Sequence, residues 1–303
     1  MTTPIVSVVV PTCRRPDFLT RCLECLRPGV QSLSAEQYEV IVSDDGEPED
    51  AAAVRRRFPW VRWTAGPRRG PAANRNHGAS LAVGRWVAFT DDDCVPGAEW
   101  LAAFVEAAEG KPDDVRGTPV FEGKTTCEAG VRSPMQQAPV NLTGGSLWSC
   151  NFMILREVFQ TLDGFDEEYR FPYMEDIDLH ERLIAVGYTP QFVPDAVVDH
   201  PPRPTLSGRR LARQHESWIY HWYKSGRRTW AGPRLVFLIL KSRLHVVRQH
   251  PISMDTFRAI GSLLVEMPSL ILRVPFWEWT YRRRFINTRG PDCPPSTPGP
   301  SSG

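Results

Sequence analysis

The stretch Trp86–Asp93, WVAFTDDD, sets the interpretation of the whole chain. Trp86–Thr90 is a short apolar run of the kind that forms a strand buried on both faces, and three aspartates follow it without a break. Two earlier runs have the same character, namely Ile5–Val10 (IVSVVV) and Tyr38–Ser43 (YEVIVS). A chain of 303 residues is long enough to bury strands of this kind in a core of its own.

Helical patterns alternate with these strands. Apolar residues recur at helical spacing over Phe18–Leu26, Val54–Phe58, Ala72–Val83 and Trp100–Ala108, and Val61–Ala65 is a further strand candidate. The alternation predicts βαβ crossovers, and therefore an α/β fold with a doubly wound, mainly parallel sheet. Ligands of such sheets bind outside the carboxyl ends of the strands, where Asp45 and Asp91–Asp93 both fall.

The sequence beyond these elements is less regular, and residues 115–150 give no assignment. The patterns predict helices over Asn151–Thr161 and Asp176–Val186 and short strands over Gln191–Val193 and Ala196–Val198, with His200 directly after them. We therefore expect the α/β domain to extend over residues 1–203.

The charge of the chain divides near residue 200. Residues 1–200 carry 19 Lys and Arg against 30 Asp and Glu, whereas residues 201–303 carry 17 against 5. The formal net charge of +1 therefore hides an acidic body and a basic C-terminal third. We expect a basic helical region over residues 204–290 and a disordered tail, rich in Pro, Ser and Gly, over residues 291–303.

Two apolar stretches lie within the basic region, Leu235–Leu240 and Ile260–Trp279. Charged residues or prolines interrupt or end both, so neither supplies the ~20 uninterrupted apolar residues that a membrane-spanning helix needs. Tryptophans are interleaved with the basic clusters, which suits a position at the headgroups of an anionic membrane surface. The alternatives are a cover over the ligand site and a solvated helical cap.

The seven cysteines are scattered and odd in number, so they give no disulfide framework. No signal peptide precedes the first apolar run. We therefore expect a cytoplasmic protein, with peripheral association at the inner face of the membrane as the alternative.

Asp91–Asp93 is the strongest chemical signal in the sequence. Adjacent carboxylates repel one another, and a bound divalent cation relieves that cost. Oxygen ligands suit Mn²⁺ or Mg²⁺, and the pleat of a strand puts Asp91 and Asp93 on the same side. An acidic turn that caps the helix beginning near Pro96 explains the same residues without a metal.

Other positions carry weaker signals. Asp45 can accept hydrogen bonds from a base or a ribose hydroxyl. The alternative is that it only forms a turn, since Asp-Gly is a common turn pair. The Arg75 guanidinium can neutralise a diphosphate, or can lie on a solvated helix face. His200 is a candidate metal ligand or a surface residue, and spacing alone does not decide between them.

Glu175 and Asp176 open an amphipathic helix. Acidic residues at a helix start are favoured by the macrodipole, so capping is the simple explanation. A carboxylate held on a rigid element can instead act as a general base aimed into a cleft.

Several longer motifs follow one another over about residues 4–200. They read VSVVVPTCRRPDFLTRCLECL, VIVSDDG, ANRNHGASLAVGRWVAFTDDDCVP, CNFMILREVFQTLDGFDEEYRFPYMEDIDLHERLIAVGY and VVDH. In this order the motifs resemble those of the family 2 glycosyltransferases, which have the GT-A fold. The resemblance implies an inverting enzyme that transfers a sugar from a nucleoside-diphosphate sugar.

The resemblance also implies a role for particular residues in binding the donor. Pro11 and the segment after it line the nucleotide pocket, Asp45 contacts the base, and Arg75 lies by the base and the diphosphate. Asp92 lies between the metal-binding aspartates and belongs to the donor site.

The remaining implied roles concern the metal and the reaction. Asp91 and Asp93 hold the Mn²⁺ or Mg²⁺ ion on the donor, and His200 matches a histidine that completes the metal site in some members. Asp176 is the catalytic base. The donor sugar, its nucleotide (uridine, guanosine or thymidine diphosphate) and the carbohydrate or lipid-linked acceptor are not given by the sequence.

Two rival functions use related features. A nucleotidyltransferase also needs carboxylates and a metal, but its Gly-rich loop is missing from Pro11–Pro16 (PTCRRP). An inactive carbohydrate- or nucleotide-binding relative would not need the aspartate triplet, the Glu-Asp pair and His200 together. Nucleic acid is not an expected partner, because no base-reading motif accompanies the basic charge.

Overall fold

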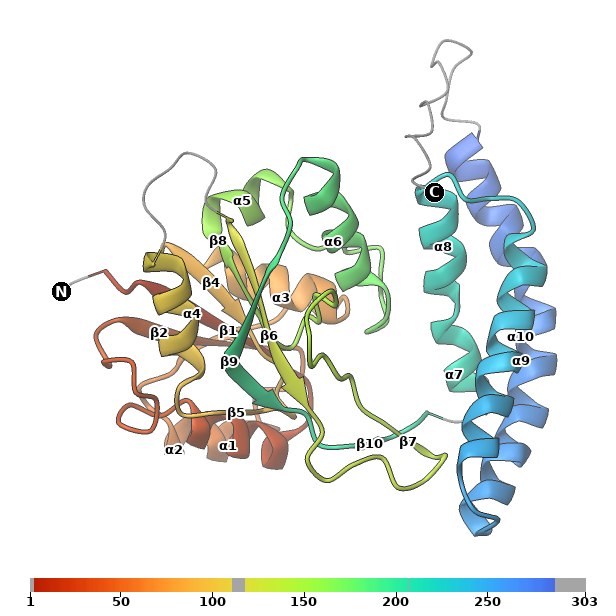
Figure 1. Ribbon diagram of the computed structural model, residues 1–303, viewed down its shortest axis with the longest axis horizontal. Coiled ribbons are helices and arrows are strands. Elements are labelled where there is room, and N and C mark those ends of the chain that lie inside the picture. Colours follow the sequence, from red (N-terminus) through yellow and green to blue (C-terminus); the bar gives the residue numbers. More distant parts are fainter. Residues whose placement is uncertain (1–2, 111–117, 207, 287–303) are drawn as a thin grey trace. The chain divides into compact units, whose positions relative to one another are not determined.

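The computed structural model describes residues 3–110, 118–206 and 208–286 (Figure 1). The chain divides into two compact units, residues 1–205 and residues 206–303. The tail expected over residues 291–303 lies outside the described residues.

The first unit is built on an eight-stranded sheet with the strand order β3-β2-β1-β4-β8-β6-β9-β5. Its strands are β1 Val6–Thr12, β2 Tyr38–Asp44, β3 Arg62–Ala65, β4 Trp86–Phe89, β5 Val95–Pro96, β6 Val120–Thr126, β8 Phe152–Leu155 and β9 Gln191–Asp199. The pairs β3–β2, β2–β1, β1–β4 and β6–β9 are parallel, whereas β8 and β5 run antiparallel to their neighbours. The short strands β7 Gln136–Gln137 and β10 Arg203–Pro204 form a separate antiparallel pair.

Helices cover both faces of this sheet (Figure 1). One face packs against α1 Pro16–Cys25, α2 Ala52–Arg57 and α4 Trp100–Glu109, and the other against α3 Pro71–Ser80, α5 Arg156–Thr161 and α6 Glu175–Ala185. Alternate residues of β1 serve the two cores, since Val8 and Val10 pack on the first side and Val9 on the second. The predicted α/β class and the doubly wound, mainly parallel sheet are confirmed.

Two predicted elements were wrong in their type or extent. Asn151–Thr161 is not one helix, because β8 occupies Phe152–Leu155 and the helix α5 begins only at Arg156. The apolar run of β8 is buried between β4 and β6, and periodicity alone does not separate such a strand from a buried helix. The two short strands expected around Pro194 are one strand, β9, whose register against β6 shifts at that point.

The second unit is helical. It consists of α7 Gly208–Gln214, α8 Glu216–Lys224, α9 Ala231–Gln249 and α10 Met254–Ile286. Leu235, Leu270 and Trp277 belong to its apolar core. Within the first unit, no helix of the described residues is long and apolar enough to cross a membrane.

The helix α10 corrects the expectation that no segment of the basic region could span a membrane. It continues through Pro268 and Pro275, the prolines that were expected to interrupt it. Its charged residue Glu266 is buried, so the charge lies on the side that packs against the rest of the unit. By length and composition α10 is able to cross a membrane.

Asn151 fixes the start of β8 and holds three segments together. Its Oδ1 accepts a hydrogen bond from Trp100 Nε1 at 2.8 Å, and its Nδ2 donates to the backbone oxygens of Lys124 at 3.0 Å and Ala196 at 3.2 Å. Gly123 makes room for this amide, because a Cβ at that position would lie 2.4 Å from Asn151 Oδ1. The Asn151 side chain is therefore used to join neighbouring segments and not to cap a helix, and the chain continues from it as the strand β8.

We predict that Asn151→Ala lowers the free energy of unfolding by about 2–4 kcal/mol, because it leaves the Trp100 N–H and the backbone oxygens of Lys124 and Ala196 buried without a partner. Urea unfolding followed by tryptophan fluorescence measures the change. The matched control is Gln137→Ala, an exposed amide whose removal should change the free energy by no more than about 0.5 kcal/mol. Equal effects of both substitutions would contradict the role of Asn151.

Candidate functional site

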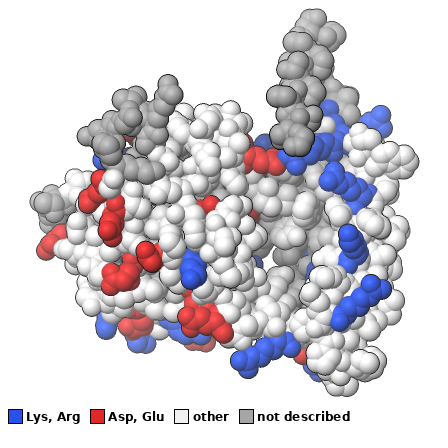
Figure 2. All heavy atoms as spheres, in the orientation of Figure 1, with Lys and Arg blue, Asp and Glu red and all other residues white. Residues whose placement is uncertain are grey.

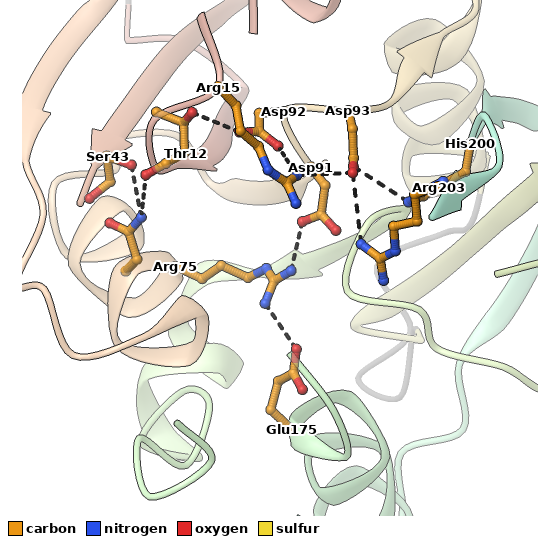
Figure 3. A network of polar contacts seen from close by, with 11 residues as sticks. Thr12, Arg15, Ser43, Arg75, Asp91, Asp92, Asp93, Glu175, His200 and Arg203 are labelled. Atoms are coloured by element: carbon orange, nitrogen blue, oxygen red, sulfur yellow. Dashed lines mark hydrogen bonds and ion pairs between the residues drawn. The ribbon is translucent and has the colours of Figure 1, made fainter. Parts of the chain in front are cut away.

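The carboxyl ends of β1 and β4 meet at the acidic turn Asp91–Asp93, and Figure 3 shows the polar network there. Thr12, the last residue of β1, donates a hydrogen bond from Oγ1 to Asp92 Oδ2 at 2.7 Å. The parallel pairing of β1 with β4 brings these residues together, although they lie 80 positions apart in the sequence. The acidic turn is therefore attached directly to the neighbouring strand.

Arg15 is the main cation over the acidic turn. It precedes α1, and its Nη1 donates to Asp92 Oδ1 at 2.8 Å and to Asp93 Oδ2 at 2.9 Å. Its side chain is 42% exposed, so the guanidinium is both paired and accessible to a ligand. The sequence analysis did not single out Arg15; the signal was the basic pair in PTCRRP directly after the first strand.

Asp92 is the most enclosed of the three aspartates. Burial raises the pKa of Asp92 to about 6, in spite of the Arg15 charge, and the negative charge of Asp93 adds to the rise. Both of its oxygens accept hydrogen bonds from the protein, one from Thr12 and one from Arg15. Its contacts in this structure serve to hold the turn.

Arg75 lies buried beneath the turn and joins it to α6. Its Nη2 donates to Asp91 Oδ1 at 2.6 Å, and its Nη1 donates to Glu175 Oε1 at 3.0 Å. Burial opposes ionisation of Asp91, but the charge and hydrogen bond of Arg75, together with the nearby charge of Arg203, outweigh burial and lower the pKa of this carboxyl. Both terminal nitrogens of the Arg75 guanidinium therefore donate to carboxylates of the protein itself.

Asp93 and His200 form the part of the network best suited to a cation. Asp93 Oδ1 and His200 Nε2 lie 3.4 Å apart, and both atoms are buried without a hydrogen-bond partner. The other ring nitrogen of His200, Nδ1, contacts the backbone oxygen of Pro201 at 3.0 Å. If Nδ1 carries the proton, Nε2 presents a lone pair toward the carboxylate, which is unfavourable until a cation lies between them.

Cys94 lies in the same cluster, since ligand atoms of Asp93, Cys94 and His200 are all within 4.8 Å of one another. Burial raises the pKa of the Cys94 thiol well above its ordinary value, so the thiol stays protonated and is a poor ligand. The remaining donors are one carboxylate oxygen and one imidazole nitrogen, with the partly exposed Asp91 carboxylate on the same turn. Two carboxylates and one imidazole are suited to bind a divalent cation.

Arg203 is a second accessible cation beside this pair. Its Nη1 lies 3.7 Å from Asp93 Oδ2, and its side chain is 32% exposed. It belongs to β10, and the sequence analysis placed it only as the boundary of the first domain. Arg15 and Arg203 thus flank Asp93, and both reach solvent.

Glu175 and Asp176 open α6 but have different surroundings. Burial raises the pKa of Glu175, and the negative charge of Asp176 raises it further; one Glu175 oxygen pairs with Arg75 and the other is buried without a partner. Asp176 Oδ1 accepts the N–H of Ile177 at 2.8 Å, and Ser149 donates a further backbone hydrogen bond. Burial also raises the pKa of Asp176.

Pro11 and Asp45 lie on the neighbouring strands rather than in this network. Pro11 is buried within β1, opposite Ser43 of β2. Asp45 is half-buried, and its Oδ1 accepts the backbone N–H of Arg68 at 2.8 Å. The adjacent Asp44, which the sequence analysis passed over, is the more buried carboxylate, and its Oδ1 accepts the N–H of Gly46.

The predicted site residues therefore fall into two groups. Arg75, Asp91–Asp93 and His200 meet in one network. Glu175 joins this network through its ion pair with Arg75, and Asp176 is the next residue of the chain. Pro11 and Asp45 lie at the ends of adjacent strands along the same edge of the sheet.

The known proteins that this chain resembles are glycosyltransferases. Residues 7–163, slightly more than half of the 303 residues, match the family described as Glycosyl transferase family 2. Glycosyltransferase AglE of Haloferax volcanii is 25% identical over 215 residues, which is 67% of this chain and 69% of that protein. An N-acetylglucosaminyl-diphospho-decaprenol L-rhamnosyltransferase of Mycobacterium tuberculosis is 38% identical over 97 residues, 31% of this chain and 30% of that protein.

A solved structure agrees in fold. The mannosyltransferase PcManGT from Pyrobaculum calidifontis, in complex with GDP-Man and Mn²⁺, matches with a TM-score of 0.53 at 16% identity and covers 95% of this chain and 89% of that one. The GT-A fold expected from the sequence is thereby confirmed, and the family match displaces the nucleotidyltransferase alternative. The chain belongs to glycosyl transferase family 2 and is a glycosyltransferase that acts with nucleotide-sugar donors.

Proposed function

We propose that this enzyme inverts the anomeric centre of a nucleoside-diphosphate sugar as it transfers the sugar to an acceptor hydroxyl, with a divalent cation and with Asp176 as general base. The observation that carries the proposal is the pair of buried, unpartnered atoms Asp93 Oδ1 and His200 Nε2, 3.4 Å apart beside the acidic turn. A purely structural turn would have no use for two such atoms, because an unsatisfied buried polar atom costs about 1–3 kcal/mol.

Asp91, Asp93 and His200 would hold the cation, Mn²⁺ or Mg²⁺. When bound, such an ion neutralises the charge of the diphosphate and favours its departure. Arg15 and Arg203 have exposed guanidinium groups beside Asp93 and are suited to contact phosphate oxygens. Arg75, which the resemblance assigned to the diphosphate, is instead suited to position Asp91 and Glu175, because both of its terminal nitrogens pair with these carboxylates.

The transfer itself is a single displacement. The acceptor oxygen attacks the anomeric carbon, the bond between that carbon and the diphosphate oxygen breaks, and the electron pair leaves with the nucleoside diphosphate. Asp176 takes the proton of the acceptor hydroxyl. Its raised pKa makes it a stronger base than an ordinary aspartate, and the start of α6 holds it on a rigid element.

We propose a lipid-linked acceptor, reached from the cytoplasmic face of a membrane. The mycobacterial relative is named for a diphospho-decaprenol substrate, which supports this class of acceptor. The basic, tryptophan-containing C-terminal region supports a location at a membrane surface.

The cation site is tested by calorimetry with GDP and UDP, each with and without Mn²⁺. Asp93→Asn and His200→Ala should each weaken Mn²⁺-dependent binding of the nucleotide at least about tenfold, because each removes one ligand. Asp195→Asn, an exposed carboxylate of β9, is the matched control and should bind as the unmodified protein does. Binding that is independent of Mn²⁺ and unchanged in Asp93→Asn would contradict the proposal.

Replacing the base should affect turnover more than donor binding. Asp176→Asn should lower kcat by about 10²–10⁴-fold with little change in nucleotide affinity, because the side chain acts on the acceptor hydroxyl. Asp163→Asn, in an exposed turn with a positive φ that Asn tolerates, is the control with unchanged turnover. Full turnover by Asp176→Asn would exclude it as the base, and one-dimensional NMR of the product would test inversion.

The pH dependence follows from the sign of the Asp176 shift. A base must be ionised, and burial raises its pKa above the ordinary 3.8, so kcat/KM should fall as the pH is lowered through a midpoint above 3.8. A pH–rate profile measures that midpoint. The residual activity of Asp176→Asn should lack this acid limb, and an unchanged limb in the variant would assign it to another group.

A further inference from the structure

Between Arg258 and Arg282, which are both exposed, every exposed residue of α10 is apolar or glycine, and the charged residues Arg273 and Glu278 are only half-exposed. The exposed positions in that interval are Ile260, Gly261, Leu264, Val265, Pro268, Ile271, Leu272, Pro275, Phe276 and Trp279. They recur at spacings of three and four residues, so they form one stripe along the helix. At ~1.5 Å per residue the stripe is ~30 Å long.

One acidic residue of α10 is instead turned inward. Glu266 of α10 is 1% exposed, and its Oε1 lies 2.8 Å from His215 Nε2 while its Oε2 lies 3.3 Å from Arg243 Nε. A helical unit in water normally buries its apolar stripe and exposes its charges. The helix α10 buries one apolar stripe, which includes Leu270 and Trp277, and also exposes a second one, and an exposed apolar surface of this size indicates a binding partner.

The neighbouring helix α9 exposes apolar side chains as well. Leu264 and Leu272 of α10 are 70% and 80% exposed, and Phe237 of α9 is 63% exposed. Leu240 and Leu244 of α9 are exposed as well. We call this surface, from Phe237 to Leu244 on α9 and from Ile260 to Trp279 on α10, the apolar face.

The charges around the apolar face indicate its partner. Residues 206–286 contain 15 Lys and Arg against four Asp and Glu. Arg258 stands at one end of the stripe and Arg282 at the other, where Arg283 also lies 4.1 Å from the ring of Trp279. Figure 2 shows Lys and Arg, in blue, spaced along the helical unit with uncharged surface between them. Apolar side chains bordered by cations and a tryptophan match the acyl boundary and the anionic headgroups of a bilayer.

We propose that the apolar face docks on an anionic lipid bilayer, with α10 lying in the plane of the membrane rather than crossing it. The packing of α9 against α10 supports this orientation. Gly232 N–H donates to Glu278 Oε1 at 2.8 Å, and Arg243 pairs with Glu266, so the two helices run antiparallel and their middles lie together.

A spanning orientation would carry cations of α9 into the hydrocarbon. Lys241 is exposed and Arg243 is half-exposed, and both lie along the middle of α10. A charged side chain at the centre of a bilayer is strongly unfavourable, whereas at the headgroups the same side chain is attracted to anionic lipid. In the plane of the membrane, the leucines of α10 enter the acyl boundary while these cations reach phosphate groups.

This inference deepens the proposed lipid-linked acceptor, because it names the surface that would bring the enzyme to such a substrate. It rests on the helical unit alone, so its test is separate from that of the proposed function. Vesicle binding requires no nucleotide, and nucleotide binding requires no vesicle. Failure of either measurement therefore leaves the other informative.

The test is co-sedimentation of the full chain with vesicles of phosphatidylcholine, with and without phosphatidylglycerol. We expect binding to the anionic vesicles, reduced by 0.5 M salt to roughly the level seen with phosphatidylcholine alone. Leu264→Glu and Leu272→Glu should each weaken binding at least about tenfold, because each removes a buried apolar side chain from the interface. Leu142→Glu, at a 54% exposed leucine of the first unit, is the matched control.

Circular dichroism and thermal melting must first show that the variants keep the fold; since both leucines are exposed, they should. Equal binding by the Leu264→Glu, Leu272→Glu and unmodified proteins would overturn the proposal. So would a lipid-independent dimer, detected by analytical ultracentrifugation, that Leu264→Glu dissociates, because the apolar face would then be a protein interface. Resistance of membrane-bound protein to alkaline carbonate would overturn the in-plane orientation in favour of a spanning α10.

Discussion

The arrangement of the site depends on the burial of adjacent carboxylates at the end of β4. Asp92 and Asp93 are almost fully buried and Asp91 is partly buried, so their charges cannot be left to water. Arg15, Arg75 and Arg203 supply the compensation, and each comes from a different segment of the chain. Arg75 is the buried member of this set, and removal of one partner of a buried ion pair costs about 3–5 kcal/mol because it leaves an uncompensated charge. The convergence of these segments is therefore a condition of stability as well as of binding.

The strands of the first half of the sheet were predictable because each is a short apolar run that ends in a turn. The aspartates were predictable for the same reason, since Asp91–Asp93 directly follow such a run. Arg75 was expected at the site, but Arg15 and Arg203 were not, because Arg15 meets Asp93 across 78 positions and no local pattern encodes that contact. Asn151 is a similar case: its partners come from α4, β6 and β9, and only the assembled sheet makes it a buried polar anchor instead of a helix start.

The two carboxylates that open α6 illustrate how surroundings separate chemically similar residues. Glu175 faces Arg75, so one of its oxygens is fixed by a buried cation. Asp176 is held by the backbone N–H of Ile177 at the start of the helix and by that of Ser149, which orient a carboxylate without joining it to a side-chain cation. A pair of acids in unequal environments can divide positioning from proton transfer. This division favours Asp176, and not Glu175, as the residue that contacts the acceptor hydroxyl.

Local charges also explain how a domain with an acidic excess can bind a nucleotide-sugar donor, which carries a diphosphate. Residues 1–200 have an excess of acidic residues, which would repel a diphosphate if the total charge governed binding. Screening limits such effects to about 8 Å in physiological salt, so the cations nearest the ligand decide the local field. In the proposed donor site these cations are Arg15 and Arg203 beside Asp93, and on the proposed membrane surface they are the basic residues of α9 and α10. A first unit with an acidic excess can therefore bind an anionic donor, provided that the contact carries its own arginines.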